Sequence, residues 1–422
     1  MAWIATALLA LLCVGILAHG LAVRGRFYGF PFLAAGMFVT FVLPQAPGIL
    51  NDYFVPHDIM APALFFSALC LAMCWAGWAI GTRSSPTWDL MLDEGRLLKA
   101  AALLSVVGAY FFYKLGALPD EQRLRGFLTG AAVAYLFFAK LLTYGLAIAV
   151  LCYARRPSKL ALGIILFDLI FYFDRIVLAG RRSDLSELLL IFALAFWFQR
   201  RWAAPRMAVL AGLCFAMVGL LGAGEYRESV HYNTERDWSA VLDIDLEANW
   251  NKLLREGGPE VRNLAYAMDH LSTNQTFDLG MSHWNSLVHT YVPAQLFGDT
   301  FKTSLYLDLP PEFPFGYASA SGSTSTGMLD AFASFWYFGC LKFLLVGMSL
   351  GWIYTAAMRG NTTMQLLYML SATPGMLVVT HFTNEIVISW VHIAAFVAPV
   401  IVFATMRTPR RRPLPMPALS AA

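Results

Sequence analysis

Two adjacent arginines, Arg181 and Arg182, are the side chains whose position in the sequence points most clearly to chemistry. They lie in a short turn between two apolar segments, just before Asp184 and Glu187, whose spacing resembles a capping box that opens a helix. Free N–H groups at a helix N-terminus and planar guanidinium groups both address phosphate oxygens. We therefore predict an anion site here, with local ion pairing to Asp184 or Glu187, or contact with lipid phosphates, as the alternative.

A third arginine, Arg175, lies in the apolar segment before this turn, together with Asp168 and Asp174. Positions 168, 175 and 182 are seven residues apart, as are 174 and 181, so each set shares one stripe if the helix is continuous. Ionisable groups within a membrane span are costly and usually face a cavity or a partner. Arg175 is predicted to deepen the phosphate site, with Asp168 or Asp174 holding it, and a purely structural buried pair is the alternative. Lys140, in an earlier apolar segment, is a similar case.

A more polar stretch between residues 224 and 327 holds the remaining candidates. Near neutral pH a histidine, or a carboxylate with a raised pKa, can take a proton from a sugar hydroxyl. The candidate bases are His283, His289 and Glu225, with His231, His270 and Glu260 as further options. The candidate phosphate ligands in this stretch are Arg227, Arg262 and Lys302, with Arg236 and Arg255 as further options. For each of them, a solvated face or packing within the loop is the alternative interpretation.

Two polar groupings could hold a metal. Asp243 and Asp245 form a DxD pattern, but the apolar spacing of Trp238–Leu254 predicts an amphipathic helix that would present this pair as a solvated acidic face. A second grouping, which could bind a metal or orient a sugar, is Asn51, Asp52, His57 and Asp58. The sequence contains no Walker A, GxGxxG or HExxH pattern, and we expect neither a metal nor a cofactor.

Membrane helices must position these candidates. The chain has 422 residues, of which 58% are hydrophobic and only 14% charged, whereas soluble proteins are about 25% charged. A bilayer core of about 30 Å needs about 20 apolar residues per helix. We predict an all-α polytopic membrane protein of about eleven spans, at 2–23, 27–49, 59–80, 100–117, 128–151, 160–178, 184–199, 207–223, 328–357, 362–380 and 386–406. No basic run resembles a nucleic-acid site.

The distribution of Lys and Arg predicts the orientation of the chain. One set of span ends, together with the C-terminal tail, carries 16 basic residues: Arg24, Arg26, Arg83, Arg96, Lys99, Arg155, Arg156, Lys159, Arg200, Arg201, Arg206, Arg359, Arg407, Arg410, Arg411 and Arg412. The opposite short connections carry four: Arg123, Arg125, Arg181 and Arg182. The first set is predicted to be cytoplasmic, so the N-terminus and the large loop face outward and the C-terminus faces inward.

These spans divide the chain into four parts: helices one to eight (1–223), a large outer loop (224–327), helices nine to eleven (328–406) and a tail (407–422). The loop is too long for an ordinary connection and is predicted to contain short helices. Pro259 is placed to start one of them, over Glu260–Leu271. A Pro-rich bend at Pro310–Pro314 and the hydroxyl-rich segment Ala318–Gly327 follow.

The arrangement resembles the Wzy-type O-antigen polymerases, which build polysaccharide from oligosaccharide repeat units, and the related O-antigen ligases. Three stretches carry the resemblance: Gly180–Leu185 entering a helix; Gly280–Asn285 followed by Val292, Pro293 and Lys302; and Ser325–Phe332 followed by Phe338–Leu341. Ala294 stands where these polymerases commonly have an arginine, so Lys302 or Arg262 is expected to take over that role.

The resemblance implies a fold like that of the C-type glycosyltransferases and a metal-independent transfer. The implied substrate is an oligosaccharide repeat unit on undecaprenyl pyrophosphate, polymerised into O-antigen or exopolysaccharide at the periplasmic face of a bacterial inner membrane. Arg181, Arg182 and a loop cation would bind the pyrophosphate. A chain-length regulator protein is an expected partner beside the lipid bilayer.

Three other functions remain open. An O-antigen ligase would use the same donor but transfer the glycan to lipid A-core. A polysaccharide transporter or flippase would line a pathway with Lys140, Asp168, Asp174 and Arg175, although the large loop and the lack of repeats argue against it. A scaffold of an export complex is the third.

Overall fold

The computed structural model describes residues 1–52, 55–86, 88–118, 131–232, 238–319 and 323–405. Within these ranges the chain forms helices and no β-strand, with one isolated bridge between Leu92 and Thr405. The first half contains α1 (Ala2–Ala22), α2 (Phe30–Met37), α3 (Ala46–Asn51), α4 (His57–Gly81), α5 (Glu94–Gly116), α7 (Ala131–Ala139), α8 (Leu141–Arg155), α9 (Lys159–Phe173), α10 (Arg182–Arg200) and α11 (Arg206–Leu221). The second half contains α12 (Ala223–Tyr226), α13 (Leu246–Glu256), α14 (Pro259–Asn274), α15 (Met281–Tyr291), α16 (Ala294–Phe297), α17 (Asp299–Ser304), α18 (Gly327–Phe335), α19 (Cys340–Met358), α20 (Thr362–Leu377) and α21 (Glu385–Ala404).

Seven helical segments of the described chain are long and apolar enough to cross a membrane, which supports a membrane-embedded protein. They are Ala2–Ala22, Phe30–Asn51, His57–Gly81, Glu94–Gly116, Ala131–Arg155, Gly327–Met358 and Glu385–Ala404. The other four expected spans also form helices, but α9, α11 and α20 have only 15, 16 and 16 residues. The fourth, α10, carries Arg182, Asp184 and Glu187 in its first two turns and Arg200 at its end. The prediction of eleven spans therefore goes beyond these seven and stays a prediction.

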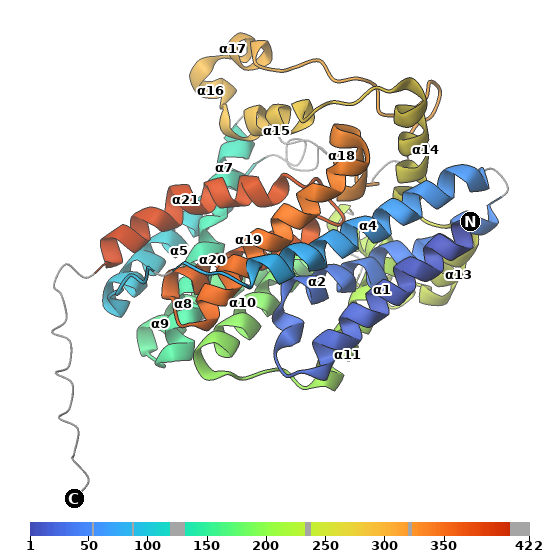
Figure 1. The fold of residues 1–422 in the computed structure, drawn as a ribbon. Helices are drawn as coiled ribbons and strands as arrows, with labels where there is room; N and C mark the ends of the chain where they lie inside the picture. The colour runs from blue at the N-terminus through green and yellow to red at the C-terminus, as the bar shows by residue number, and fades with distance from the viewer. Residues whose placement is uncertain (53–54, 87, 119–130, 233–237, 320–322, 406–422) are drawn as a thin grey trace, which may run out of the picture.

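The bundle is held most tightly where α4 packs along α19. Both helices bring glycines to the contact, and a Cβ added at Gly77 would overlap the carbonyl oxygen of Leu344. On the other helix, a Cβ at Gly347 would overlap the carbonyl oxygen of Cys74. Small residues let helix backbones approach closely where no water drives the helices together. The two helices run side by side (Figure 1).

Several arginines assigned to one membrane side do meet at one end of the bundle. Each donates hydrogen bonds there: Arg155 to the side chains of Gln199 and Thr362, Arg200 to the carbonyl of Ala154, Arg201 to the carbonyl of Met358, and Arg206 to the carbonyl of Ala22. The ends of α1, α8, α10, α19 and α20 therefore lie together, as the charge distribution predicted. Which side of a membrane this end faces stays a prediction, and the tail lies outside the described residues.

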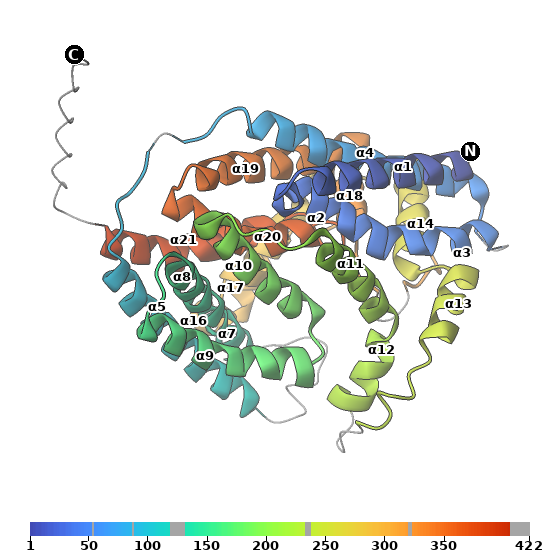
Figure 2. The same ribbon diagram turned by 90° about the horizontal axis from the view of Figure 1, so that it is seen from below.

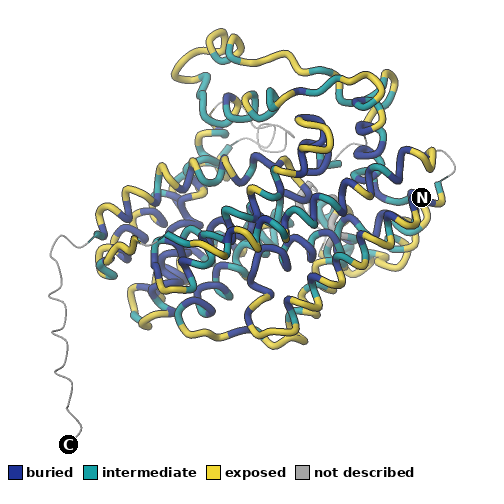
Figure 3. Tube along the Cα trace, in the orientation of Figure 1, coloured by how far each residue is buried: buried dark blue, intermediate teal, exposed yellow. Residues whose placement is uncertain are grey.

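The large loop rests directly on the other end of the bundle. Helix α13 packs against α3, and α14 packs against α4 and α18. The buried side chains of α14, Val261, Leu264, Met268 and Leu271, join the same hydrophobic core as the bundle. Farther along, α16, α17 and the segment after them are exposed (Figure 3). The first half of the loop is thus fixed to the helices beneath it.

Two local predictions for the loop can be compared with its helices. Pro259 is the first residue of α14, as predicted. The predicted amphipathic helix over Trp238–Leu254 is wrong in its first half, because α13 begins only at Leu246. Asp245 is the N-cap of that helix and accepts a hydrogen bond from the Ala248 N–H at 2.9 Å, so the DxD pair precedes the helix.

Candidate functional site

The turn that carries the two arginines differs from the predicted capping box. After α9 the chain continues through a π-helical turn, Asp174–Leu178, and then reverses at Gly180, whose φ of 61° lies in the left-handed region. Helix α10 begins at Arg182 with Arg181 as its N-cap, and no side chain caps it. The capping-box prediction for Asp184 and Glu187 is therefore wrong.

Asp184 instead forms a buried ion pair with Arg175. Arg175 donates from Nε to Oδ2 at 2.9 Å and from Nη2 to Oδ1 at 2.7 Å, and the two side chains are 15% and 9% exposed. Arg175 is held by neither Asp168 nor Asp174, and the predicted stripe does not continue to Arg182, because the helix ends at Leu178 and the chain reverses at Gly180. Asp168 is fully buried elsewhere and accepts a hydrogen bond from Ser105 at 2.8 Å. Because Arg175 is already paired with the carboxylate of Asp184, its guanidinium group is not available to bind a phosphate.

The two arginines of the turn and Arg227 form a group of positive charges that we call the arginine cluster. Gly180 lies against Tyr226 and Arg227, and the Tyr226 hydroxyl donates to the carbonyl of Val177 at 2.5 Å. This contact fixes the turn to the start of the loop, where α12 lies between the beginning of α10 and α13 (Figure 2). Asp184 attracts the charge of Arg181, whereas Arg175 and Arg227 repel it, and Arg227 also repels the charge of Arg182. Like charges held this close favour an anion between them.

Within the described chain, Arg181 has no side-chain hydrogen bond or ion pair. Arg182 donates one hydrogen bond, from Nη1 to the carbonyl of Gly219 at 3.3 Å. Its acidic neighbour is Glu260, at the start of α14, which also contacts the side chain of Gln45. Burial raises the pKa of Glu260, with Arg182 opposing that rise. The cluster therefore keeps an excess of positive charge.

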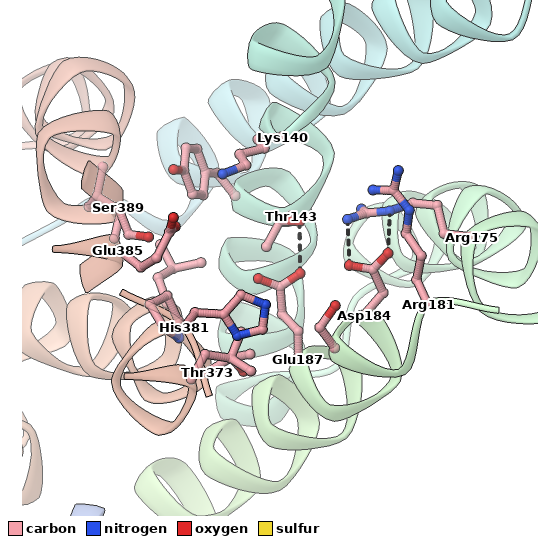
Figure 4. A pocket seen from close by; sticks show the side chains of 16 residues that line it. Lys140, Thr143, Arg175, Arg181, Asp184, Glu187, Thr373, His381, Glu385 and Ser389 are labelled. Atoms are coloured by element: carbon pink, nitrogen blue, oxygen red, sulfur yellow. Dashed lines mark hydrogen bonds and ion pairs between the residues drawn. The ribbon is translucent and has the colours of Figure 1, made fainter. Parts of the chain in front are cut away.

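Arg181 also lines a polar cavity of about 240 Å³. Figure 4 shows side chains entering it from α8 and α10 on one side and from α20, α21 and their connection on the other. The ionisable residues that line the cavity are Lys140, Tyr144, Arg175, Arg181, Asp184, Glu187, His381 and Glu385. Glu187 accepts hydrogen bonds from Tyr172 at 2.9 Å and Thr143 at 3.3 Å. The cavity thus combines cations with groups able to exchange protons.

His381 and Glu385 did not emerge from the sequence as candidates. His381 lies in the connection between α20 and α21, and Glu385 is the first residue of α21. A histidine and a carboxylate at four-residue spacing beside an apolar helix were the available signal. Their place in the cavity depends on α20 and α21 packing next to α8 and α10, which sequence spacing does not reveal.

His283, a predicted base, belongs to a second charged cluster, formed with Asp330 and Lys342 at the foot of the loop. The Lys342 ammonium donates to His283 Nε2 and, at 2.8 Å, to Ser334 Oγ. His283 Nδ1 lies 3.6 Å from Asp330 Oδ1, while Asp330 Oδ2 accepts hydrogen bonds from the N–H and hydroxyl of Thr383 at 2.9 and 2.5 Å. Burial lowers the pKa of His283. Because Nε2 accepts from Lys342 and Nδ1 is buried against Asp330, His283 is poorly placed to deprotonate a sugar.

The other predicted loop residues lie outside the polar cavity. The Lys302 ammonium donates to the carbonyl of His289 at 2.9 Å, and burial lowers the pKa of His289. Arg262 forms an ion pair with Asp52 at 2.7 Å, so its charge is largely neutralised. Glu225 accepts a hydrogen bond from Asn249 at 2.9 Å and lies in a shallow pocket with Asp243. Arg236 and the side chain of His231 fall outside what the structure describes.

The acidic groupings give no metal centre in the described ranges, where no three His, Cys, Asp or Glu side chains are arranged to hold an ion. Asp52 is engaged by Arg262, and Asp245 caps α13.

In comparisons with known proteins, no protein family, no curated protein and no solved structure matches the chain.

Proposed function

We propose that the protein is a membrane glycosyltransferase that polymerises oligosaccharide repeat units carried on undecaprenyl pyrophosphate. The observation that carries the proposal is the arginine cluster, in which guanidinium groups repel one another beside a polar cavity and the foot of a large loop. A diphosphate would neutralise these positive charges, and its oxygens would accept hydrogen bonds from the guanidinium groups. The sequence resemblance to Wzy-type polymerases supports the same substrate class.

In this mechanism the donor glycan enters with its pyrophosphate on Arg181, Arg182 and Arg227. Attack by a hydroxyl of the acceptor glycan at the anomeric carbon breaks the bond to the pyrophosphate oxygen and inverts that carbon. Negative charge then develops on the leaving group, where prearranged cations in a site of low dielectric stabilise it. Lys140, which also lines the cavity, adds a further positive charge.

A large apolar cavity next to the polar one supports a lipid substrate. It has a volume of about 780 Å³, lies between α4, α19, α20 and α21, and is lined by Trp88, Trp352 and Trp390 among mainly aliphatic side chains. Ile393 lines both cavities. A prenyl chain in the apolar cavity would place its pyrophosphate in the polar one.

The proposal places the arginine cluster and the loop at the periplasmic face of the bacterial inner membrane, with a chain-length regulator as partner. An O-antigen ligase would share the donor site and differ only in its acceptor. A gene deletion separates the two, because loss of a polymerase leaves single repeat units on the cell surface, whereas loss of a ligase leaves none.

A transporter is the second candidate, favoured by the ionisable residues Lys140 and Glu187 inside a helical cavity. Proteoliposomes containing the purified protein and the lipid-linked oligosaccharide of a deletion strain distinguish the two. A polymerase lengthens the glycan, whereas a transporter only moves it between leaflets.

The test in cells compares variants in the deletion strain. We expect Arg181→Gln/Arg182→Gln to abolish long-chain polysaccharide while the protein stays inserted at normal abundance. Arg156→Gln, an exposed arginine at the opposite end of the bundle, is the matched control and keeps normal polymer. Normal polymer from the double variant would refute the assignment.

A further inference from the structure

His381 presents one ring nitrogen to the polar cavity. Its Nδ1 lies 2.8 Å from Thr380 Oγ1, and that hydroxyl is directed at the carbonyl of Leu377 at 3.4 Å. A hydroxyl has a single proton, so a Thr380 that donates to Leu377 must accept from Nδ1. In the Nδ1-protonated tautomer that this arrangement favours, Nε2 keeps its lone pair. No hydrogen bond to Nε2 occurs within the described residues, although the ring lines the cavity.

Glu385, the first residue of α21, lies four residues after His381 along the chain and lines the same cavity. Its carboxylate favours the protonated form of His381. Between these two residues, Thr383 is fixed by its two hydrogen bonds to Asp330 of α18. The second charged cluster thus anchors the connection that carries His381.

We propose that His381 is the general base of the transfer reaction and that Glu385 is its positioning residue. This inference rests on the proposed function and extends it by naming the proton acceptor. The acceptor hydroxyl oxygen forms the new bond to the anomeric carbon as its proton passes to His381 Nε2. The bond from the anomeric carbon to the phosphate oxygen breaks, and its electron pair leaves with the polyprenyl pyrophosphate. No other reactant is needed.

The charges around His381 suit a base that is neutral before the reaction. Although His381 is partly exposed to solvent, desolvation by the surrounding helices lowers its pKa below the ordinary value of 6.5, and Glu385 opposes this. The other ionisable groups that face the cavity are Lys140 and Tyr144 of the α8 segment, Arg181 of the turn, Glu187 of α10, and the mutually paired Arg175 and Asp184. When His381 takes up a proton, the carboxylate of Glu385 stabilises the imidazolium.

The experiment uses full-length protein in proteoliposomes and lipid-linked oligosaccharide extracted from a strain lacking the gene. Glycan lengthening is measured in single turnovers from pH 5 to 8, and binding is measured separately with inorganic pyrophosphate. We expect His381→Gln to bind pyrophosphate as wild type does and to transfer about 100-fold more slowly or worse, in the range typical of a lost general base. The wild-type rate should fall at acidic pH as His381 becomes protonated, and this fall should be absent from the residual rate of the variant.

Glu385→Gln supplies a second readout that a merely structural role would not give. Without the carboxylate, the acidic fall in rate should move to lower pH. His270→Gln, at a half-buried loop histidine that is bonded to Asn274 and lies outside the cavity, is the matched control and should behave as wild type. A His381→Gln rate within 10-fold of wild type, or an acidic limb unchanged in both cavity variants, overturns the role of His381 alone. Absence of any lengthening by wild type overturns the proposed function with it.

Discussion

The ion pair between Arg175 and Asp184 gives the most quantitative test of how the turn is built. Its two short hydrogen bonds, at 2.7 and 2.9 Å, join side chains that are 15% and 9% exposed. Removing one partner of a buried pair leaves the other charge without compensation and costs about 3–5 kcal/mol. We expect Arg175→Met and Asp184→Leu each to destabilise the protein by this amount. Replacing both with apolar residues, as in Arg175→Met/Asp184→Leu, should cost much less than the two single changes together.

The assay is reversible unfolding in mixed micelles of SDS and a mild detergent, which yields the free energy of unfolding of all three variants. A double-mutant cycle should give a coupling energy of about 2–3 kcal/mol. Arg156→Gln, which alters an exposed arginine, should change the free energy of unfolding very little. Single variants that lose under about 1 kcal/mol, as exposed pairs do, or a double variant that loses the full sum, would refute this account of the turn.

Three further outcomes follow from the described contacts. Gly77→Val should destabilise the protein by at least about 1–3 kcal/mol, because its side chain overlaps the backbone of α19; thermal unfolding in detergent measures this. Asp330→Ala removes the acceptor of the Thr383 N–H and also the carboxylate beside His283 of α15. The loop should loosen, and faster proteolysis of the α15–α17 segment should report this. Glu260→Gln removes a negative charge close to Arg182, so titration with pyrophosphate should show binding tightened several-fold, by about 1 kcal/mol. A wild-type result in any of the three would contradict the corresponding contact.

The sequence was a good guide where local pattern determines structure. The apolar runs predicted all eleven segments as helices, the excess of Arg and Lys predicted which helix ends meet, and Pro259 predicted the start of α14. Each of these features depends on neighbouring residues or on a bulk property of the chain.

Side-chain partners were much less predictable, because they depend on small changes of register and on packing between distant helices. The end of the helix at the π turn Asp174–Leu178 is not encoded by a recognisable pattern, yet the reversal at Gly180 that follows brings Asp184, in place of Asp168, to Arg175. Lys342, inside an apolar run, was not singled out, and it engages His283 from 59 positions away along the chain. His381 was missed because only the packing of α20 and α21 brings it to the cavity of Arg181.

Binding of inorganic pyrophosphate to the purified protein tests the central claim most directly, since the whole account depends on a diphosphate held by the arginine cluster. Titration of wild type, Arg181→Gln, Arg182→Gln and Arg227→Gln at two salt concentrations requires no knowledge of the sugar. We predict saturable binding that weakens with salt and falls about 10-fold for each guanidinium removed, equivalent to about 1.4 kcal/mol. Equal affinity in wild type and all three variants, or no binding by wild type at low salt, would contradict the account.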